Sequence, residues 1–203
     1  MNTSHVHPRT RDDEDSVTYY RTLEMAVRAL LVEKGVFSAA DVRRAVEMMD
    51  GRNYTSGARV AVRAWLDGDF RARLLENGAD AVAEMGLAVG PLKLVVVENT
   101  PALHNVVVCT LCSCYPRMLL GLPPDWYKSR EYRSRVVIEP RAVLADFGTH
   151  LPPPVAIRVH DSTADMRYMV LPMRPAGSDG ESAEQLARRV TRDALIGTAV
   201  IDR

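Results

Sequence analysis

The segment from Asn105 to Pro116 reads NVVVCTLCSCYP, and it places all three cysteines of the 203-residue chain within six positions. Three consecutive valines precede the cysteines and are typical of a short buried strand. The segment therefore predicts a strand that leads directly into a loop of closely spaced thiols. An odd number of cysteines in so tight a cluster makes a poor disulfide framework and indicates metal or redox chemistry in a reducing compartment.

The spacing of apolar residues changes on either side of residue 87. Upstream it has the period of a helix, and helices are predicted from residue 17 to Gly35, over 38–49, over 56–66 and over 69–85, the last with a break at Asn77 and Gly78. Downstream, strands are predicted over 92–98, 105–108, 155–159 and 167–171, the last two as a pair, with short helices over 140–147, 184–190 and 191–196.

The fold class that follows is α+β, with an N-terminal helical region and then a compact mixed α/β segment that carries the thiol loop. The predicted parts are a flexible N-terminal arm at 1–16, a helical region at 17–87 and a metal-binding α+β catalytic domain at 88–203.

Composition argues against two classes of partner. Lys and Arg number 26, as do Asp and Glu, and aromatic residues make up 6% of the chain, so neither a basic field nor stacking platforms for nucleic acid are expected. The apolar runs fall short of the roughly 20 residues of a membrane span, and the polar N-terminus has no secretory signal. We therefore expect a cytoplasmic protein.

Several kinds of thiol site compete on spacing alone. A structural zinc site takes four ligands, and here one Cys-x-x-Cys pair and one further thiol supply three, so His104 or His150 would have to complete it. A disulfide between Cys109 and Cys112 would leave Cys114 unexplained. These readings define one alternative, a non-catalytic zinc or redox module.

The Cys-Ser-Cys end of the cluster allows a further arrangement. If the amide nitrogens of Ser113 and Cys114 lose their protons, they can bind a metal ion together with the sulfurs of Cys112 and Cys114, in a chain of small chelate rings. Cys109 then supplies a fifth donor from one side, and the opposite position stays open. Amide deprotonation requires a strong Lewis acid, which favours a trivalent, octahedral ion over zinc.

Longer stretches resemble a known family. The segments VVVENTPALHNVVVCTLCSCYP (95–116), LGLPPDWYKS (120–129), YRSRVV (132–137), RYMVLPMRPAG (167–177), TRDALIGTA (191–199) and GARVAVRAWLDGDFRARLL (57–75) are similar to nitrile hydratase alpha subunits. The resemblance covers nearly all of the chain beyond the N-terminal arm.

The resemblance implies a metal site and its ligands. Cys109, Cys112 and Cys114 would bind through sulfur, and Ser113 and Cys114 through main-chain nitrogen. Thr110 matches the cobalt branch of the family, which implies non-corrin Co(III), with Fe(III) as the alternative. Cys112 would be oxidised to a sulfinic acid and Cys114 to a sulfenic acid. Cys114 and Ser113 are the implied catalytic residues.

The same resemblance implies a function and partners. The chain would be one subunit of a hetero-oligomeric hydro-lyase that hydrates a small-molecule nitrile to its amide. A beta-type subunit would supply positive partners for the oxidised sulfurs, and an activator protein would deliver cobalt.

Some positions depart from the family pattern. Arg117 replaces the usual tryptophan after Cys-Tyr-Pro and is a candidate substrate-binding residue, and His160 also stands where tryptophan is common. Arg117 would suit the anion bound by the sibling thiocyanate hydrolase, whose gamma subunit has the same motif, and an altered pocket would also suit a specialised nitrile of the nucleoside-antibiotic type. We expect His160 to be a packing residue. Asp161, Asp165 and Arg167 are expected to form a surface ion-pair cluster, with a polar network beneath the metal as the alternative.

Overall fold

The computed structural model describes residues 11 to 201, and side chains from Thr18 onward. It confirms the α+β class. The chain divides into two compact units, one up to Met49 and one from Asp50 on. Within the described residues, no helix combines the length and the apolar character that crossing a membrane requires.

The first unit is a pair of helices, α1 (Arg11–Glu33) and α2 (Ala39–Asp50). Of the arm predicted at 1–16, residues 11–16 belong to α1, and residues 1–10 lie outside the described residues. Gly35, with a φ of 69°, ends the first helix as predicted. Ser38 and Asp41 form a reciprocal cap at the start of α2, since each main-chain N–H donates to the other side chain, at 2.8 and 3.1 Å.

Three helices open the second unit: α3 (Thr55–Leu66), α4 (Gly68–Glu76) and α5 (Gly78–Ala83). The predicted break at Asn77 is confirmed, because the Asn77 side chain accepts the Asp80 N–H and so begins α5. Arg71 of α4 donates twice to Glu98, both at 2.7 Å, and this bidentate pair joins the helices to the strand that follows.

Four strands follow: β1 (Lys93–Glu98), β2 (Leu103–Val108), β3 (Ala156–Asp161) and β4 (Met166–Leu171). The expected pairing of the last two is wrong. β4 pairs with β1 and β3 pairs with β2, in both cases parallel. A period of two identifies a strand whichever partner it takes, so the pattern could not show that each late strand joins an early one.

Short helices fill the rest of the unit: α6 (Arg117–Leu120), α7 (Asp125–Lys128), α8 (Arg130–Ile138), α9 (Pro140–Asp146), α10 (Ala183–Arg189) and α11 (Arg192–Ile196). The last three of these, α9, α10 and α11, fall where the sequence predicts short helices. Ser129 begins α8 by accepting the N–H of Tyr132 at 3.1 Å, a cap that sequence analysis did not identify.

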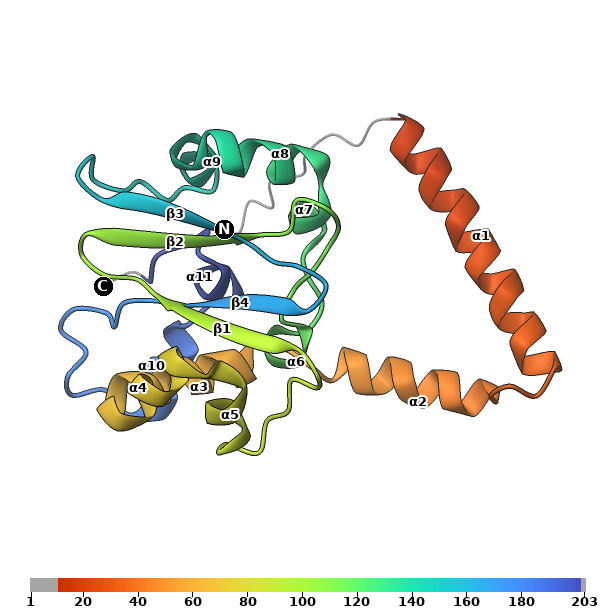
Figure 1. Cartoon of the computed structure of the whole chain (residues 1–203), viewed down its shortest axis with the longest axis horizontal. Coiled ribbons are helices and arrows are strands. Elements are labelled where there is room, and N and C mark those ends of the chain that lie inside the picture. Colours follow the sequence, from red (N-terminus) through yellow and green to blue (C-terminus); the bar gives the residue numbers. More distant parts are fainter. Residues whose placement is uncertain (1–10, 202–203) are drawn as a thin grey trace. The chain divides into compact units, whose positions relative to one another are not determined.

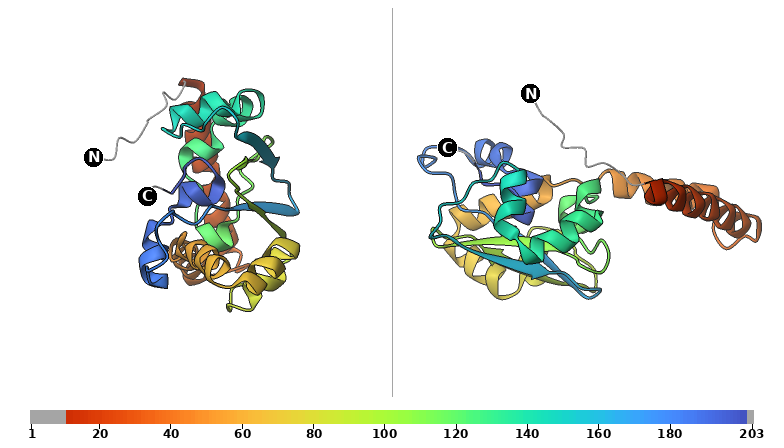
Figure 2. Two further views of the ribbon diagram at one scale, coloured as in Figure 1. Left: turned by 90° about the vertical axis from the view of Figure 1, so that its left-hand side faces the viewer. Right: turned by 90° about the horizontal axis from the view of Figure 1, so that it is seen from above.

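Within this unit the two strand pairs lie next to each other, with α7–α9 at one end of the layer and α3–α5 at the other (Figure 1). Two further views show α10 and α11 on one face of the strands (Figure 2). At the end of α11, Gly197 has a φ of 84°, and a Cβ there would lie 1.9 Å from the Asn105 carbonyl oxygen. Only glycine lets this helix approach β2 so closely.

A buried polar network fixes the centre of the strand layer. The Gly197 carbonyl can only accept, so His104 Nε2 carries a proton and donates to it at 2.8 Å, and Nδ1 accepts from the Asn99 amide at 3.2 Å. Asn105 N–H donates to Asn99 Oδ1 at 2.7 Å, and Asn105 Oδ1 accepts from His160 Nε2 at 2.9 Å. The network joins the end of β1, β2, β3 and α11, and it requires a neutral His104.

We predict that this network makes the fold sensitive to acid. Burial of the ring holds the pKa of His104 below its usual value, and the hydrogen bond to Gly197 opposes that effect only in part. A histidine that is neutral when folded and charged when unfolded contributes stability above about pH 6.5 and loses it as the pH falls below that value. Denaturation of the purified protein between pH 8 and 5 should show this loss.

The control is His104→Gln, which keeps an N–H donor for Gly197 but does not titrate. Its denaturation midpoint should be lower at pH 8 yet fall less between pH 7 and 5. The difference between the two slopes is limited to one proton, about 1.4 kcal/mol per pH unit. Parallel curves for wild type and variant would refute the assignment.

Candidate metal centre

The thiol loop begins where β2 ends. Val108 is the last residue of the strand, and its carbonyl accepts the Ser162 N–H at 2.7 Å, so the end of β3 lies beside the start of the loop. Because β2 and β3 are parallel, their carboxyl ends meet at one edge, with Val108 opposite Asp161 in the register. The predicted strand-to-loop arrangement is confirmed.

The three thiols meet in one small cluster. The Cys112 sulfur lies 3.5 Å from that of Cys109 and 3.3 Å from that of Cys114, and all three sulfurs lie within 4.8 Å of one another. Cys109 is buried, Cys114 is half-buried and Cys112 is exposed, so the cluster opens to the surface on one side.

The thiols influence one another's ionisation in opposite directions. Hydrogen bonds from Cys114 and then Cys109 lower the pKa of Cys112. Burial, followed by the hydrogen bond with Cys112, raises the pKa of Cys114 to about 12. One thiolate therefore forms readily and the next only with difficulty, since like charges at this distance repel.

The donor set fits a metal ion. Three thiolates can coexist at these distances only with a cation among them, and thiolate is a strong ligand for transition metals. The main-chain N–H groups of Ser113 and Cys114 also help to lower the pKa of Cys112.

Histidine does not complete a four-ligand set here. Both ring nitrogens of His104 are hydrogen-bonded within the buried network, to Asn99 and Gly197. Among the described residues, the group whose ligand atoms lie close together contains the three thiols and no histidine. The fourth ligand that zinc would need from His104 or His150 is therefore not brought to the cluster.

Asp161 holds the front of the loop. Its carboxylate accepts from the Thr110 N–H at 2.9 Å and from the Thr110 hydroxyl at 2.6 Å. The expectation of a surface ion-pair cluster is wrong for Asp161 and Arg167, because no ion pair in the described part of the chain joins them. Arg167 instead donates to the carbonyls of Thr163, Ala164 and Met166.

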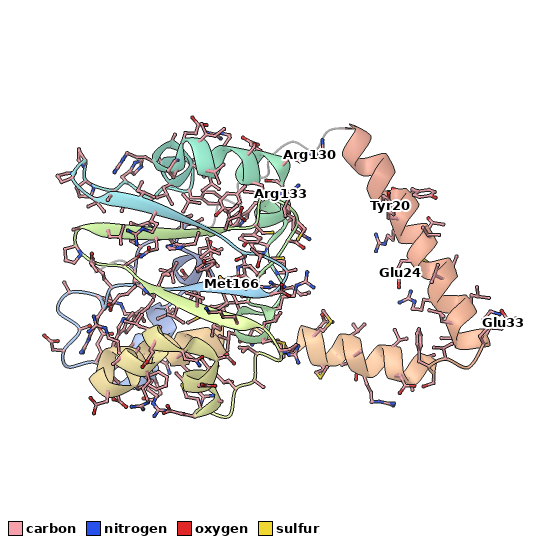
Figure 3. All side chains as sticks on the ribbon, viewed as in Figure 1. Tyr20, Glu24, Glu33, Arg130, Arg133 and Met166 are labelled. Atoms are coloured by element: carbon pink, nitrogen blue, oxygen red, sulfur yellow. The ribbon has the colours of Figure 1, made fainter. Side chains whose placement is uncertain are left out.

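Two arginines bring positive charge to the loop. Arg133 of α8 donates to the Thr110 carbonyl at 3.3 Å, and its position on that helix can be followed in Figure 3. The charge of Arg167 acts to lower the pKa of Cys114, although burial outweighs it. Nothing in the sequence pointed to Arg133, whereas Arg167 belongs to the charged cluster for which a polar network beneath the metal was the alternative expectation.

The other two positions that depart from the family pattern have clear surroundings. Arg117 is exposed at the first residue of α6, and no hydrogen bond or ion pair of its side chain is found among the described residues. His160 stacks on Tyr168, with ring centroids 4.9 Å apart, and donates to Asn105. His160 is thus a hydrogen-bonded packing residue, as expected.

Comparison with known proteins gives related enzymes along most of the chain. The low-molecular-weight cobalt-containing nitrile hydratase alpha subunit of Rhodococcus rhodochrous is 49% identical over 86% of this chain and 86% of its own. The thiocyanate hydrolase gamma subunit of Thiobacillus thioparus is 45% identical, over 92% of this chain and 82% of its own. Both kinds of relative match the predicted resemblance.

A solved structure agrees with the fold. A double mutant of the Fe-type nitrile hydratase of Comamonas testosteroni Ni1 superposes with a TM-score of 0.86 at 40% identity, covering 92% of this chain and 91% of the other. The sequence model described as "Nitrile hydratase, alpha chain" matches residues 18–199. The resemblance and the assignment of an enzyme subunit are both confirmed, and this chain belongs to the nitrile hydratase alpha-chain family.

Proposed function

We propose that the chain is the alpha subunit of a cobalt-type nitrile hydratase, which adds water to a nitrile and releases the amide. The observation that carries the proposal is the meeting of the Cys109, Cys112 and Cys114 sulfurs within 4.8 Å at the open end of a buried strand. Relatives named as cobalt-containing nitrile hydratase subunits support the choice of metal.

The proposed ligands are those three sulfurs and the main-chain nitrogens of Ser113 and Cys114, holding Co(III), with Fe(III) as the alternative. When bound, a trivalent ion with one open position supplies Lewis-acid activation of the nitrile or of water. Thr110 supports cobalt by its resemblance to the cobalt branch, and its contacts with Asp161 hold the loop in place.

Oxidation of two thiols belongs to the same proposal. An oxygen-donating oxidant would convert Cys112 to a sulfinic acid and Cys114 to a sulfenic acid, two steps and one step up the thiol ladder. The exposed and half-buried positions of these thiols give an oxidant access, whereas Cys109 is buried and stays a thiolate. The Cys114 sulfenate is the proposed nucleophile, and the charge of Arg167 already acts on the unoxidised Cys114 side chain by lowering its pKa, against the larger effect of burial.

A beta-type subunit is the proposed partner, with an activator protein that delivers cobalt in the cytoplasm. Support comes from the first unit, where apolar side chains that a lone chain would bury are exposed, among them Tyr20, Leu23, Val27 and Leu30. Tyr20 projects from α1 in Figure 3. An apolar hollow of about 540 Å³ also lies between α1 and α2, lined by residues such as Leu31, Phe37 and Val42.

A second candidate is thiocyanate hydrolysis, and Arg117 is the observation that favours it. An exposed guanidinium three residues after Cys114 suits an anionic substrate better than a neutral one. We rank a nitrile first, because most of the related subunits carry the nitrile hydratase name. A specialised nitrile, such as one on a nucleoside-antibiotic base, would suit the altered pocket.

The assembled enzyme provides the test of the proposed function. Coexpressed with its partner subunit and activator, the chain should carry one cobalt and hydrate members of a panel of aliphatic, aromatic and deazapurine nitriles. Intact-peptide mass spectrometry should find two added oxygens on Cys112 and one on Cys114. Cys114→Ala should abolish hydration while the complex still assembles. Zinc in place of cobalt, with unoxidised cysteines, would contradict the proposal.

Substitution of Arg117 distinguishes between the two candidate substrates. If the substrate is thiocyanate, Arg117→Gln should raise its KM by about tenfold or more, since hydrogen bonds to charged groups contribute about 1.5–3 kcal/mol. If the substrate is a neutral nitrile, the KM should change little. Arg130→Gln, which removes another exposed arginine, is the matched control and should leave both substrates unaffected.

A further inference from the structure

The far end of the thiol loop is held by one buried phenol. Tyr127 lies on the short helix α7, its side chain has no exposed surface, and its hydroxyl donates to the Cys114 carbonyl oxygen at 2.9 Å. At the front of the loop, Asp161 accepts the hydrogen bond from the Thr110 N–H. Leu111, which lies between Thr110 and Cys114 in the chain, is 86% exposed. The loop is thus fixed at its two ends and free of packing in the middle.

The position of this phenol is set by its neighbours. The Tyr127 ring packs edge-on against Tyr115 at a centroid distance of 5.0 Å and lies 5.8 Å from the Tyr132 ring. Trp126 adds a third aromatic contact at 6.1 Å. Burial raises the pKa of Tyr127, so its oxygen stays protonated and remains a donor.

We propose that Tyr127 is a positioning residue of the metal centre: through its hydrogen bond to the Cys114 carbonyl it sets the main chain of Cys114, and with it the nitrogen and sulfur of that residue, for metal binding. The proposal rests on the proposed function, because it concerns the same ligands. It goes further in assigning a task to a side chain that touches neither metal nor substrate.

The covalent geometry of Cys114 links its carbonyl oxygen to the two proposed metal ligands of that residue. The main-chain nitrogen, the carbonyl carbon and the side chain of Cys114 are all bonded to the same Cα. Fixing the carbonyl oxygen therefore restricts the main-chain rotations that would move the sulfur and the nitrogen of Cys114 away from Cys112. The sulfurs of Cys112 and Cys114 lie 3.3 Å apart. A site arranged in advance spends less of its binding free energy on ordering the loop.

The chain provides a matched control. Tyr132 is also buried, at 4% exposure, and its hydroxyl donates to the Val107 carbonyl at 2.7 Å. Val107 lies in β2, ahead of the loop, so this hydrogen bond supports the strand and not the proposed metal ligands. Tyr127→Phe and Tyr132→Phe therefore remove equivalent hydrogen bonds at different distances from the thiols.

The test uses the complex with the partner subunit, prepared without metal and titrated with Co²⁺. Both variants should lower the thermal midpoint by similar amounts. Tyr127→Phe alone should weaken cobalt binding by about fivefold or more, the low end of what a stranded buried carbonyl costs, and should shift the sulfur-to-cobalt absorption bands. Equal cobalt affinity and equal spectra for the two variants would overturn the inference.

Two further outcomes are distinguishable. If the wild-type complex takes up no cobalt, the proposed function fails and this inference fails with it. If Tyr127→Phe does not assemble, 3-fluorotyrosine is placed at position 127 and, in a second sample, at position 132. The stronger donor should move the cobalt absorption bands only from position 127, and unchanged bands would overturn the inference.

Discussion

The parallel pairing of β2 with β3 is the constraint on which the rest of the site depends. It brings Asp161 to the edge where the thiol loop begins, and the two hydrogen bonds from Thr110 to its carboxylate fix the first turn of that loop. Asn105 stands at the centre of the pair and bonds both His160 on β3 and Asn99 beyond β1. A slip of one residue would turn each of these polar groups to the other face of the layer.

Electrostatics explains why so small a loop needs a cation. The second and third sulfurs lie 3.3 Å apart, and burial and the neighbouring thiol both oppose ionisation of Cys114. Arg133 and Arg167 supply positive charge from this chain, the first through the Thr110 carbonyl and the second through space. They act from beside the loop, and the three sulfurs that face one another still need a cation among them.

Local signals carried the sequence prediction far. The helix break at Asn77 and the strand formed by the valine run before Cys109 could be predicted, because they depend on residues a few positions apart. The pairing of β3 and β4 was not, since a strand reads the same whichever neighbour it joins. Asp161 was misjudged for that reason: its role depends on lying opposite Val108, a residue more than fifty positions earlier. The hydrogen bond from Tyr127 to the Cys114 carbonyl became visible only in the fold.

X-ray absorption at the cobalt edge of the mature, partner-bound enzyme tests the central claim most directly. The account predicts an octahedral trivalent ion with three sulfur neighbours and two short bonds to nitrogen from the main chain of Ser113 and Cys114. A tetrahedral ion surrounded by side-chain ligands alone would contradict it.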